Sequence, residues 1–199
     1  VRMELTNTLR ILSDTGLLPS PYLQYFYFTE EIAATQRTSG VTRAMEVMSL
    51  EKDLLTEYRE AAAGGRPLSI RRGGRWHADM MVGMLGAVAN DARDLYIVNV
   101  PNHGSMPELP YEKVVEVPCV VDASGAHALA MGNMPVQIRG LIQSVAAYEE
   151  LAVEAALTGS KERGVDALAC HPLVCSRDLA QRLLDAYLGA HKQYLPAFS

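Results

Sequence analysis

Residues 95–100 (LYIVNV) and 113–122 (KVVEVPCVVD) decide the fold class of this chain, because β-branched residues concentrate in them. Short runs of this composition are typical of strands. Residues 101–111 (PNHGSMPELPY) separate the two runs and contain three prolines, which is typical of a loop. After the second run, Ser124 and Gly125 predict a turn that leads into the short apolar segment HALAM (127–131). The sequence therefore predicts a small sheet near the middle of the chain.

Apolar residues at helical spacing lie on both sides of this sheet region. Near the N-terminus, Leu5, Leu9 and Leu12 recur close to the helical period. The same kind of pattern predicts helices over residues 1–16, 43–63, 76–92, 135–157, 160–170 and 176–192. We expect the hydroxyls of Thr42 and Ser176 to cap two of these helices. The predicted fold class is α+β, mostly helical with a small central antiparallel or mixed sheet, in a single domain over residues 1–199.

The segment PYLQYFYF (21–28) holds the densest group of aromatic residues in the chain. It could form a strand, or the start of a helix that continues into TEEIAATQR (29–37), and both alternatives stay open. Its tyrosines could pack in a core or at an interface. One of them could instead act as a base, if a neighbouring cation lowers its phenol pKa from about 10. Taken alone, Arg43 is a residue at the start of a helix.

Charge and hydropathy exclude several classes of protein. The chain has 18 Lys and Arg against 23 Asp and Glu, and no long basic run, so we expect no nucleic-acid partner. No apolar run approaches the roughly 18 residues of a membrane span, and the start VRMELTNTLR is no signal peptide. Three cysteines are an odd number, which favours a reduced, cytoplasmic setting over a disulfide framework. The absence of an initiator Met indicates a cut or processed chain.

Short motifs give only weak signals. The sequence has no G-x-G-x-x-G and no P-loop. The RRGG segment (71–74) could hold an anion, although a solvated basic loop is favoured. Cys170, His171 and Cys175 lack the full ligand set of a structural zinc site, so buried free cysteines are favoured over a metal. For residues 102–104 (NHG), a turn that uses the backbone freedom of Asn and Gly is favoured over a catalytic histidine.

Longer segments resemble the C-terminal half of glycoside hydrolase family four, in particular its 6-phospho-β-glucosidase branch. They occur in the family's order and at its spacing over nearly the whole chain. The segments are PSPYLQYFYF (19–28), TRAMEVM (42–48), RRGG (71–74), VNVPNHGSMPELP (98–110), VVEVPCVV (114–121), MPVQIRGLIQSVAAYEELAVEAALTG (134–159), DALACHPLV (166–174) and HKQYLPAF (191–198).

This resemblance implies that residues 1–199 are a C-terminal catalytic and substrate domain, with a fold similar to the C-terminal domain of lactate and malate dehydrogenases. It also implies that an N-terminal Rossmann domain, which binds NAD, is missing from this chain. The Cys and His ligands of a divalent metal, typically Mn²⁺, would lie in that missing part. We therefore expect no cofactor-binding or metal-ligating residues here. Further expectations are a phosphorylated sugar substrate, no membrane partner, and a homodimer or homotetramer in the cytoplasm.

The resemblance also implies roles for individual residues in an unusual glycoside cleavage. The sugar is oxidised at C3, a tyrosine removes the proton from C2, and the aglycone is eliminated. The tyrosine matches Tyr25, with Tyr22 in reserve. Arg43 matches an arginine that binds the sugar phosphate, and Arg72 is a weaker candidate for lining the pocket. The family also contains α-glycosidases, and where members often read RGG-Ala-Tyr-Tyr-Ser this chain continues after RGG with RWHA (75–78).

Two other functions remain open at this point. One is half of a lactate- or malate-like 2-hydroxy acid dehydrogenase. The other is a non-catalytic domain that serves oligomerisation. Because the sequence has no motif that binds NAD, we expect the 199-residue chain to be inactive alone.

Overall fold

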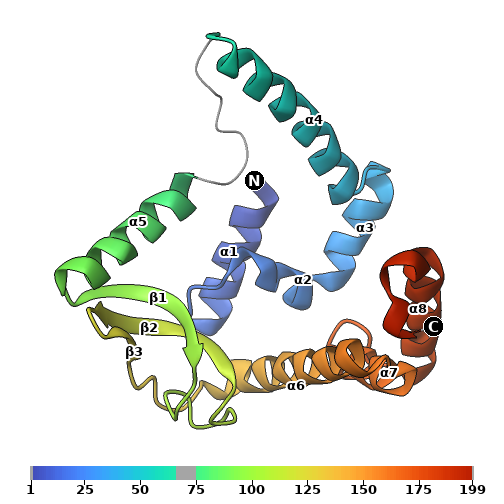
Figure 1. The fold of residues 1–199 in the computed structure, drawn as a ribbon. Helices are drawn as coiled ribbons and strands as arrows, with labels where there is room; N and C mark the ends of the chain where they lie inside the picture. Colours follow the sequence, from blue (N-terminus) through green and yellow to red (C-terminus); the bar gives the residue numbers. More distant parts are fainter. Residues whose placement is uncertain (1, 66–74, 199) are drawn as a thin grey trace. The chain divides into compact units, whose positions relative to one another are not determined.

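A computed structural model describes residues 2–65 and 75–198 of the chain. These residues form α-helices, short 3₁₀ turns and a three-stranded antiparallel sheet, which confirms the predicted α+β fold (Figure 1). The chain divides into two compact units, Val1–Glu30 with Asn133–Ser199, and Glu31–Gly132. Within the described ranges, no helix has both the length and the apolar character that a membrane crossing requires.

The first unit is helical. It contains α1 (Arg2–Thr15), η1 (Pro21–Leu23), α2 (Gln24–Tyr27), α6 (Val136–Thr158), α7 (Lys161–Cys170), α8 (Arg177–His191), η2 (Lys192–Tyr194) and η3 (Pro196–Phe198). Helix α3 (Thr29–Ser39) begins at its edge and continues into the second unit. The predicted helices over 1–16, 135–157, 160–170 and 176–192 are confirmed to within a few residues. Ser176 caps α8 as expected, because its Oγ accepts from the Leu179 N–H at 3.3 Å.

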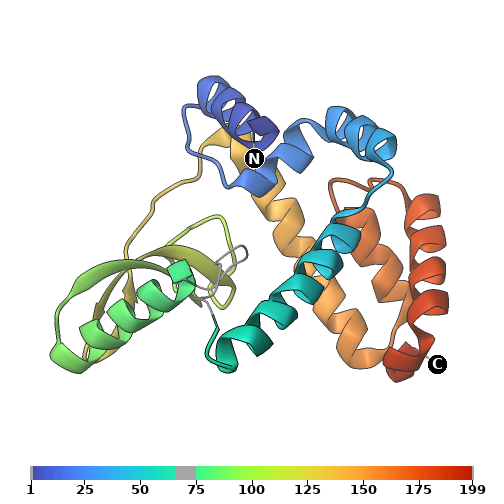
Figure 2. The same cartoon turned by 90° about the horizontal axis from the view of Figure 1, so that it is seen from above.

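Helix α7 packs against both α6 and α8 (Figures 1 and 2). Val165 of α7 meets Ala180 and Leu184 of α8 in a small buried cluster. Gly159 ends α6 in the left-handed conformation, with φ 69°. A side chain at this position would overlap the carbonyl oxygen of Ala197 in η3. Glycine is therefore required here both by its backbone conformation and by the close approach of the C-terminal turn.

The second unit holds most of α3, the long helix α4 (Arg43–Ala62), α5 (Arg75–Asn90) and the sheet of β1 (Asp94–Pro101), β2 (Val114–Asp122) and β3 (Gly125–Ala128). Thr42 caps α4 as predicted, because its Oγ1 accepts from the Met45 N–H at 3.3 Å. The predicted helices over 43–63 and 76–92 are thus confirmed.

The sheet has the order β1-β2-β3, and both pairs are antiparallel. Alternate residues of β2 are buried, and they pack with Ala87 of α5 into an apolar core: Val115, Val117, Cys119 and Val121. Helix α5 thus covers one face of β2, and the period of two in the sequence produces this core. The predicted strands are confirmed, but HALAM is partly a third strand, because Ala126 and Ala128 pair with Val121 and Cys119.

Candidate functional site

The aromatic segment 21–28 is neither a strand nor a long helix. It forms the 3₁₀ turn η1 followed by the single-turn helix α2. Ser20 accepts from the Tyr22 N–H at 3.4 Å and starts the turn. Thr29 donates its hydroxyl to the Tyr25 carbonyl at 2.6 Å, at the other end of the segment. Tyr25 is 36% exposed and Tyr22 is 74% exposed, so neither residue is buried.

A buried polar pair holds α2 against α1. Gln24 of α2 and Asn7 of α1 are almost fully buried, and Asn7 donates its amide to Gln24 Oε1 at 3.3 Å. Arg10 donates to Asn7 Oδ1 at 3.1 Å, and its guanidinium lies 3.8 Å from the centroid of the Phe28 ring. This group places the residue before Tyr25 by hydrogen bonds in a dry environment, where they are costly to break.

An aromatic contact holds the other flank of Tyr25. The Phe26 ring lies 6.0 Å from the imidazole of His171, between centroids. The same imidazole meets the Tyr148 ring of α6 edge to face, at 4.7 Å and 84°. No pattern in the sequence connects Phe26 with His171, since the two are far apart along the chain and their contact depends on tertiary structure.

His171 therefore serves as an aromatic contact in this structure. Cys175 donates its thiol to the Pro172 carbonyl, with the sulfur at 3.1 Å, and both Cys170 and Cys175 are exposed. The interpretation of Cys170 and Cys175 as buried cysteines is thus wrong, whereas Cys119, in the sheet, is buried. Among residues 2–65 and 75–198, no group of three or more His, Cys, Asp and Glu side chains could hold a metal ion.

Arg43 is the first residue of α4. Its guanidinium donates to Glu46 Oε2 at 3.0 Å, and its side chain is 76% exposed. Tyr25 belongs to the first compact unit and Arg43 to the second, so their action on one substrate stays a prediction. Arg72 lies outside the described residues.

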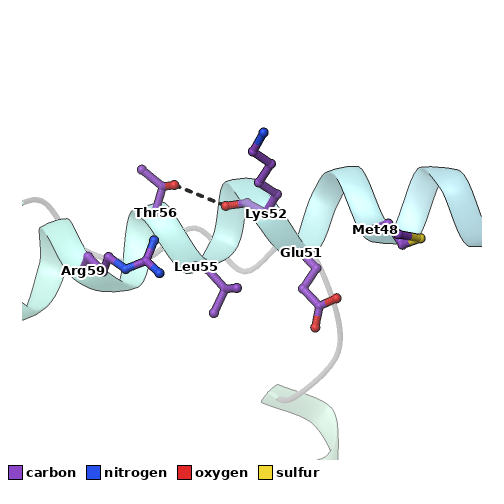
Figure 3. A pocket seen from close by; sticks show the side chains of 6 residues that line it. All are labelled: Met48, Glu51, Lys52, Leu55, Thr56 and Arg59. Carbon is purple, nitrogen blue, oxygen red and sulfur yellow. Dashed lines mark hydrogen bonds between the residues drawn. The ribbon is translucent and has the colours of Figure 1, made fainter.

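A shallow hollow of about 330 Å³ runs along the surface of α4. Its described lining comes from this helix alone, with Thr56 Oγ1 bonded to the Lys52 carbonyl at 3.2 Å (Figure 3). The lining residues are Met48, Glu51, Lys52, Leu55, Thr56 and Arg59. One helix face cannot surround a ligand, because binding sites are normally concave and built from several elements.

The loop between β1 and β2 depends on Asn102, which is 1% exposed. Its amide donates to the carbonyls of Met106 and Leu109, each at 2.9 Å, and of Pro110 at 3.1 Å. Its Oδ1 accepts from the Met106 N–H at 2.7 Å. The turn is confirmed, but Asn102 contributes side-chain hydrogen bonds. The left-handed residues are His103 and Gly104, with φ 43° and 86°.

His103 of this loop faces solvent with modest partners. Its ring stacks on that of Tyr111 at 4.8 Å between centroids, and its Nε2 lies 3.9 Å from Glu112 Oε2. Both side chains of the ion pair are largely exposed, so it contributes little to stability. The loop thus has a structural explanation in Asn102, as the sequence favoured.

Comparison with known proteins gives a consistent result. Residues 3–174 match the family 4 glycosyl hydrolase C-terminal domain. A probable 6-phospho-beta-glucosidase of Bacillus subtilis is 34% identical over 192 residues, which is 94% of this chain and 43% of the relative. This chain therefore spans less than half the length of that relative.

Solved structures show the same fold. The crystal structure of a 6-phospho-alpha-glucosidase from gut microorganisms, in complex with NAD and glucose-6-phosphate, superposes with a TM-score of 0.85 at 28% identity, over 98% of this chain and 44% of that one. The 6-phospho-beta glucosidase of Thermotoga maritima, with manganese, NAD+ and glucose-6-phosphate, gives a TM-score of 0.80 at 28% identity, over 98% of this chain and 48% of that one.

Proposed function

The chain belongs to the family 4 glycosyl hydrolases and comprises their C-terminal domain, and on this premise we propose that it is part of an NAD- and Mn²⁺-dependent 6-phospho-β-glucosidase. The observation that carries the proposal is the match over residues 3–174. The 34% identity to the Bacillus subtilis relative supports a β-linked substrate. The likeness to a 6-phospho-alpha-glucosidase at TM-score 0.85 makes the α-linked substrate the alternative to test.

Tyr25 is the proposed base. Tyr25 is 36% exposed, while Gln24 and Phe26 on either side are held by α1 and by His171. A tyrosine that is partly exposed and whose backbone is held in place can contact a sugar and keep its oxygen oriented toward the C2 hydrogen. Once C3 of the sugar is a ketone, the C2–H bond breaks and its proton goes to the phenolate oxygen of Tyr25. The electron pair of that bond forms a C1–C2 double bond, and the aglycone leaves C1 with the electrons of its bond. General-base catalysis of this kind contributes about 10²–10⁴-fold in rate.

Arg43 is the proposed phosphate ligand. Its pair with Glu46 is exposed on both sides, and exposed pairs of this type are worth only about 0–1 kcal/mol. A phosphate that accepts two parallel hydrogen bonds from the guanidinium competes well with such a partner. Arg72 is proposed as a further residue near the substrate.

NAD and the metal are assigned to the part of the protein outside this chain. The described residues offer no group of metal ligands, and the full sequence has no dinucleotide-binding glycine motif. The residues present therefore do not fit either group. We expect the 199-residue chain alone to be inactive. A homodimer or homotetramer and a cytoplasmic location stay predictions, the former supported by exposed Met80, Met81 and Leu85 on α5.

The test uses the whole protein with aryl 6-phospho-β-glucosides and their α-anomers, in the presence of NAD+ and Mn²⁺. Tyr25→Phe should lower kcat about 10²–10⁴-fold, because it removes the general base. Tyr22→Phe tests the reserve tyrosine and should leave kcat unchanged if Tyr25 is the base. The wild type should react more slowly with a C2-deuterated substrate. Unchanged turnover in Tyr25→Phe would remove Tyr25 as base, and net NADH release with a 2-hydroxy acid would overturn the glycosidase itself.

Arg43→Gln tests the phosphate contact in the same assay. It should raise KM for the phosphorylated glycoside by about tenfold to 100-fold, the value of a charge-assisted hydrogen bond. Arg59→Gln, on the last turn of the same helix, is the control and should leave KM unchanged. A KM unaffected by Arg43→Gln would contradict the assignment.

A further inference from the structure

The turn after α7 fixes the imidazole of His171 through its own backbone. The Leu173 N–H donates to His171 Nδ1 at 3.2 Å. The His171 carbonyl accepts from the N–H groups of Val174 at 2.9 Å and Cys175 at 3.2 Å. The Nδ1 atom of His171 is thereby engaged as a hydrogen-bond acceptor. Hydrogen bonds within residues 171–175 therefore help to orient the imidazole ring.

That fixed ring lies between α6 and α2. Tyr148 of α6 meets it edge to face at 4.7 Å, and Phe26 of α2 lies at 6.0 Å with an interplanar angle of 35°. Both distances fall in the range of favourable aromatic pairs, about 4.5–7 Å. His171 and Tyr148 belong to elements that pack directly on each other. Phe26 belongs to a helix of four residues, which cannot persist without contacts from outside.

We propose that His171 is a positioning residue for Tyr25, and that it acts through Phe26. The inference rests on the proposed function, since it concerns the base of that reaction. Gln24 is tied to Asn7 on α1 at 3.3 Å, so α2 is anchored on one side only if the His171 contact is lost. Free to rotate about that anchor, α2 no longer holds the Tyr25 oxygen on the C2 hydrogen. A misplacement of about 1 Å can lower a rate about 100-fold.

Two substitutions at His171 separate its ring from its hydrogen bond. His171→Asn places an amide oxygen near the position of Nδ1, so the Leu173 N–H keeps an acceptor while the ring is lost. His171→Phe keeps a ring between Phe26 and Tyr148 but offers Leu173 no acceptor. The proposal requires His171→Asn to be the damaging change and His171→Phe to restore most of the wild-type behaviour. His127→Asn, at an exposed position in the other compact unit, is the control.

The first measurement is amide hydrogen exchange in the whole protein, which needs no turnover. In His171→Asn, exchange over residues 21–28 should become about tenfold faster, as expected for the loss of one or two aromatic pairs. Exchange over α6 should stay unchanged, as should exchange over residues 21–28 in His127→Asn. Wild-type exchange over residues 21–28 in His171→Asn would overturn the proposal, whether or not the enzyme proves to be a glycosidase.

The second measurement is the steady-state assay with ordinary and C2-deuterated phosphoglycoside. His171→Asn should lower kcat about tenfold or more with KM within about twofold, and should raise the deuterium isotope effect, because proton transfer becomes slower. A merely structural role would reduce the active fraction and leave the isotope effect at the wild-type value, which would overturn the proposal. Absence of turnover in the wild type would refute the proposed function alone, since the exchange measurement still decides the contact.

Discussion

The sheet of β1–β3 and the tyrosine segment 21–28 are held by opposite kinds of contact. In the sheet, alternate β2 side chains such as Val117 and Cys119 pack on Ala87 in a dry, apolar core. The tyrosine segment is held by a buried amide pair, a cation over a ring and an aromatic contact: Asn7 with Gln24, Arg10 with Phe28, and Phe26 with His171. Apolar packing is non-directional, whereas amides and rings are satisfied only in particular orientations. The segment that carries the proposed base is thus the one held by directional contacts.

The largest effect is expected in the β1–β2 loop. This loop is ordered by the buried polar side chain of Asn102, although the sheet beside it has an apolar core. Asn102→Ala should lower the free energy of unfolding of the sheet by about 3 kcal/mol, since it removes a buried amide that donates to three loop carbonyls and accepts from the Met106 N–H. The measurement is amide hydrogen exchange in β2. The control Asn99→Ala, at an exposed position of β1, should change the free energy of unfolding by less than about 0.5 kcal/mol. Equal effects would show that Asn102 is not what orders the loop.

The buried amide pair of Asn7 and Gln24 tests whether hydrogen bonds or burial stabilise the segment that carries Tyr25. Asn7→Ala should destabilise the first unit by about 1–3 kcal/mol, because Gln24 Oε1 and Arg10 each lose a partner. The double variant Asn7→Leu with Gln24→Leu should recover much of that loss, as apolar pairs of similar shape can replace buried hydrogen bonds. Denaturant unfolding of the wild type, Asn7→Leu, Gln24→Leu and the double variant completes a double-mutant cycle. Strictly additive effects would mean that the two amides do not interact.

The tip of the β2–β3 hairpin should give the smallest effect. Hydrogen bonds from the Ser124 hydroxyl at 2.6 Å and the Ser124 N–H at 2.8 Å, with His127 nearby, hold the pKa of Asp122 at about 2, below its ordinary value of 3.8. Its folded pKa is lowered, so its stabilising contribution is complete above about pH 4 and is lost as the pH falls through about 2. Asp122→Asn should remove this part of the acid dependence.

Ser124→Ala sharpens the same test, because it keeps the Asp122 charge and removes the largest cause of the shift. The pKa of Asp122, followed by NMR of its carboxyl group, should move up toward 3.8. A pKa that stays at about 2 would assign the shift to the backbone and His127 instead.

Local signals in the sequence predict most of the fold. Runs of β-branched residues give β1 and β2, and hydroxyls at Thr42 and Ser176 give the starts of α4 and α8. The third strand is not marked by alternation, since β3 is short and forms by pairing with β2. In segment 21–28, aromatic residues suit a strand and a helix equally well. Only the contacts with α1 and His171 select the short helix.

The candidate site is less predictable, because its determinants are tertiary. The leucine spacing in α1 predicts a helix, yet Leu5 and Leu9 are exposed, while Asn7 and Ile11 of the same helix are buried. A buried asparagine cannot be recognised from α1 alone, since its partner Gln24 lies 17 residues further along the chain. Tyr25 was predicted through the family resemblance, whereas the residues that orient it follow only from the structure.

The three cysteines differ in a way that is useful for labelling. Cys119 is fully buried in the sheet core, and this burial raises the pKa of its thiol. Cys170 and Cys175 are exposed, one on each side of His171. Since thiolates are the species that react with maleimides and iodoacetamides, these reagents will attach at the two exposed sulfurs and spare Cys119. A fluorophore at Cys175, in a Cys170→Ser background, would give an optical reporter beside the imidazole without any engineered attachment point.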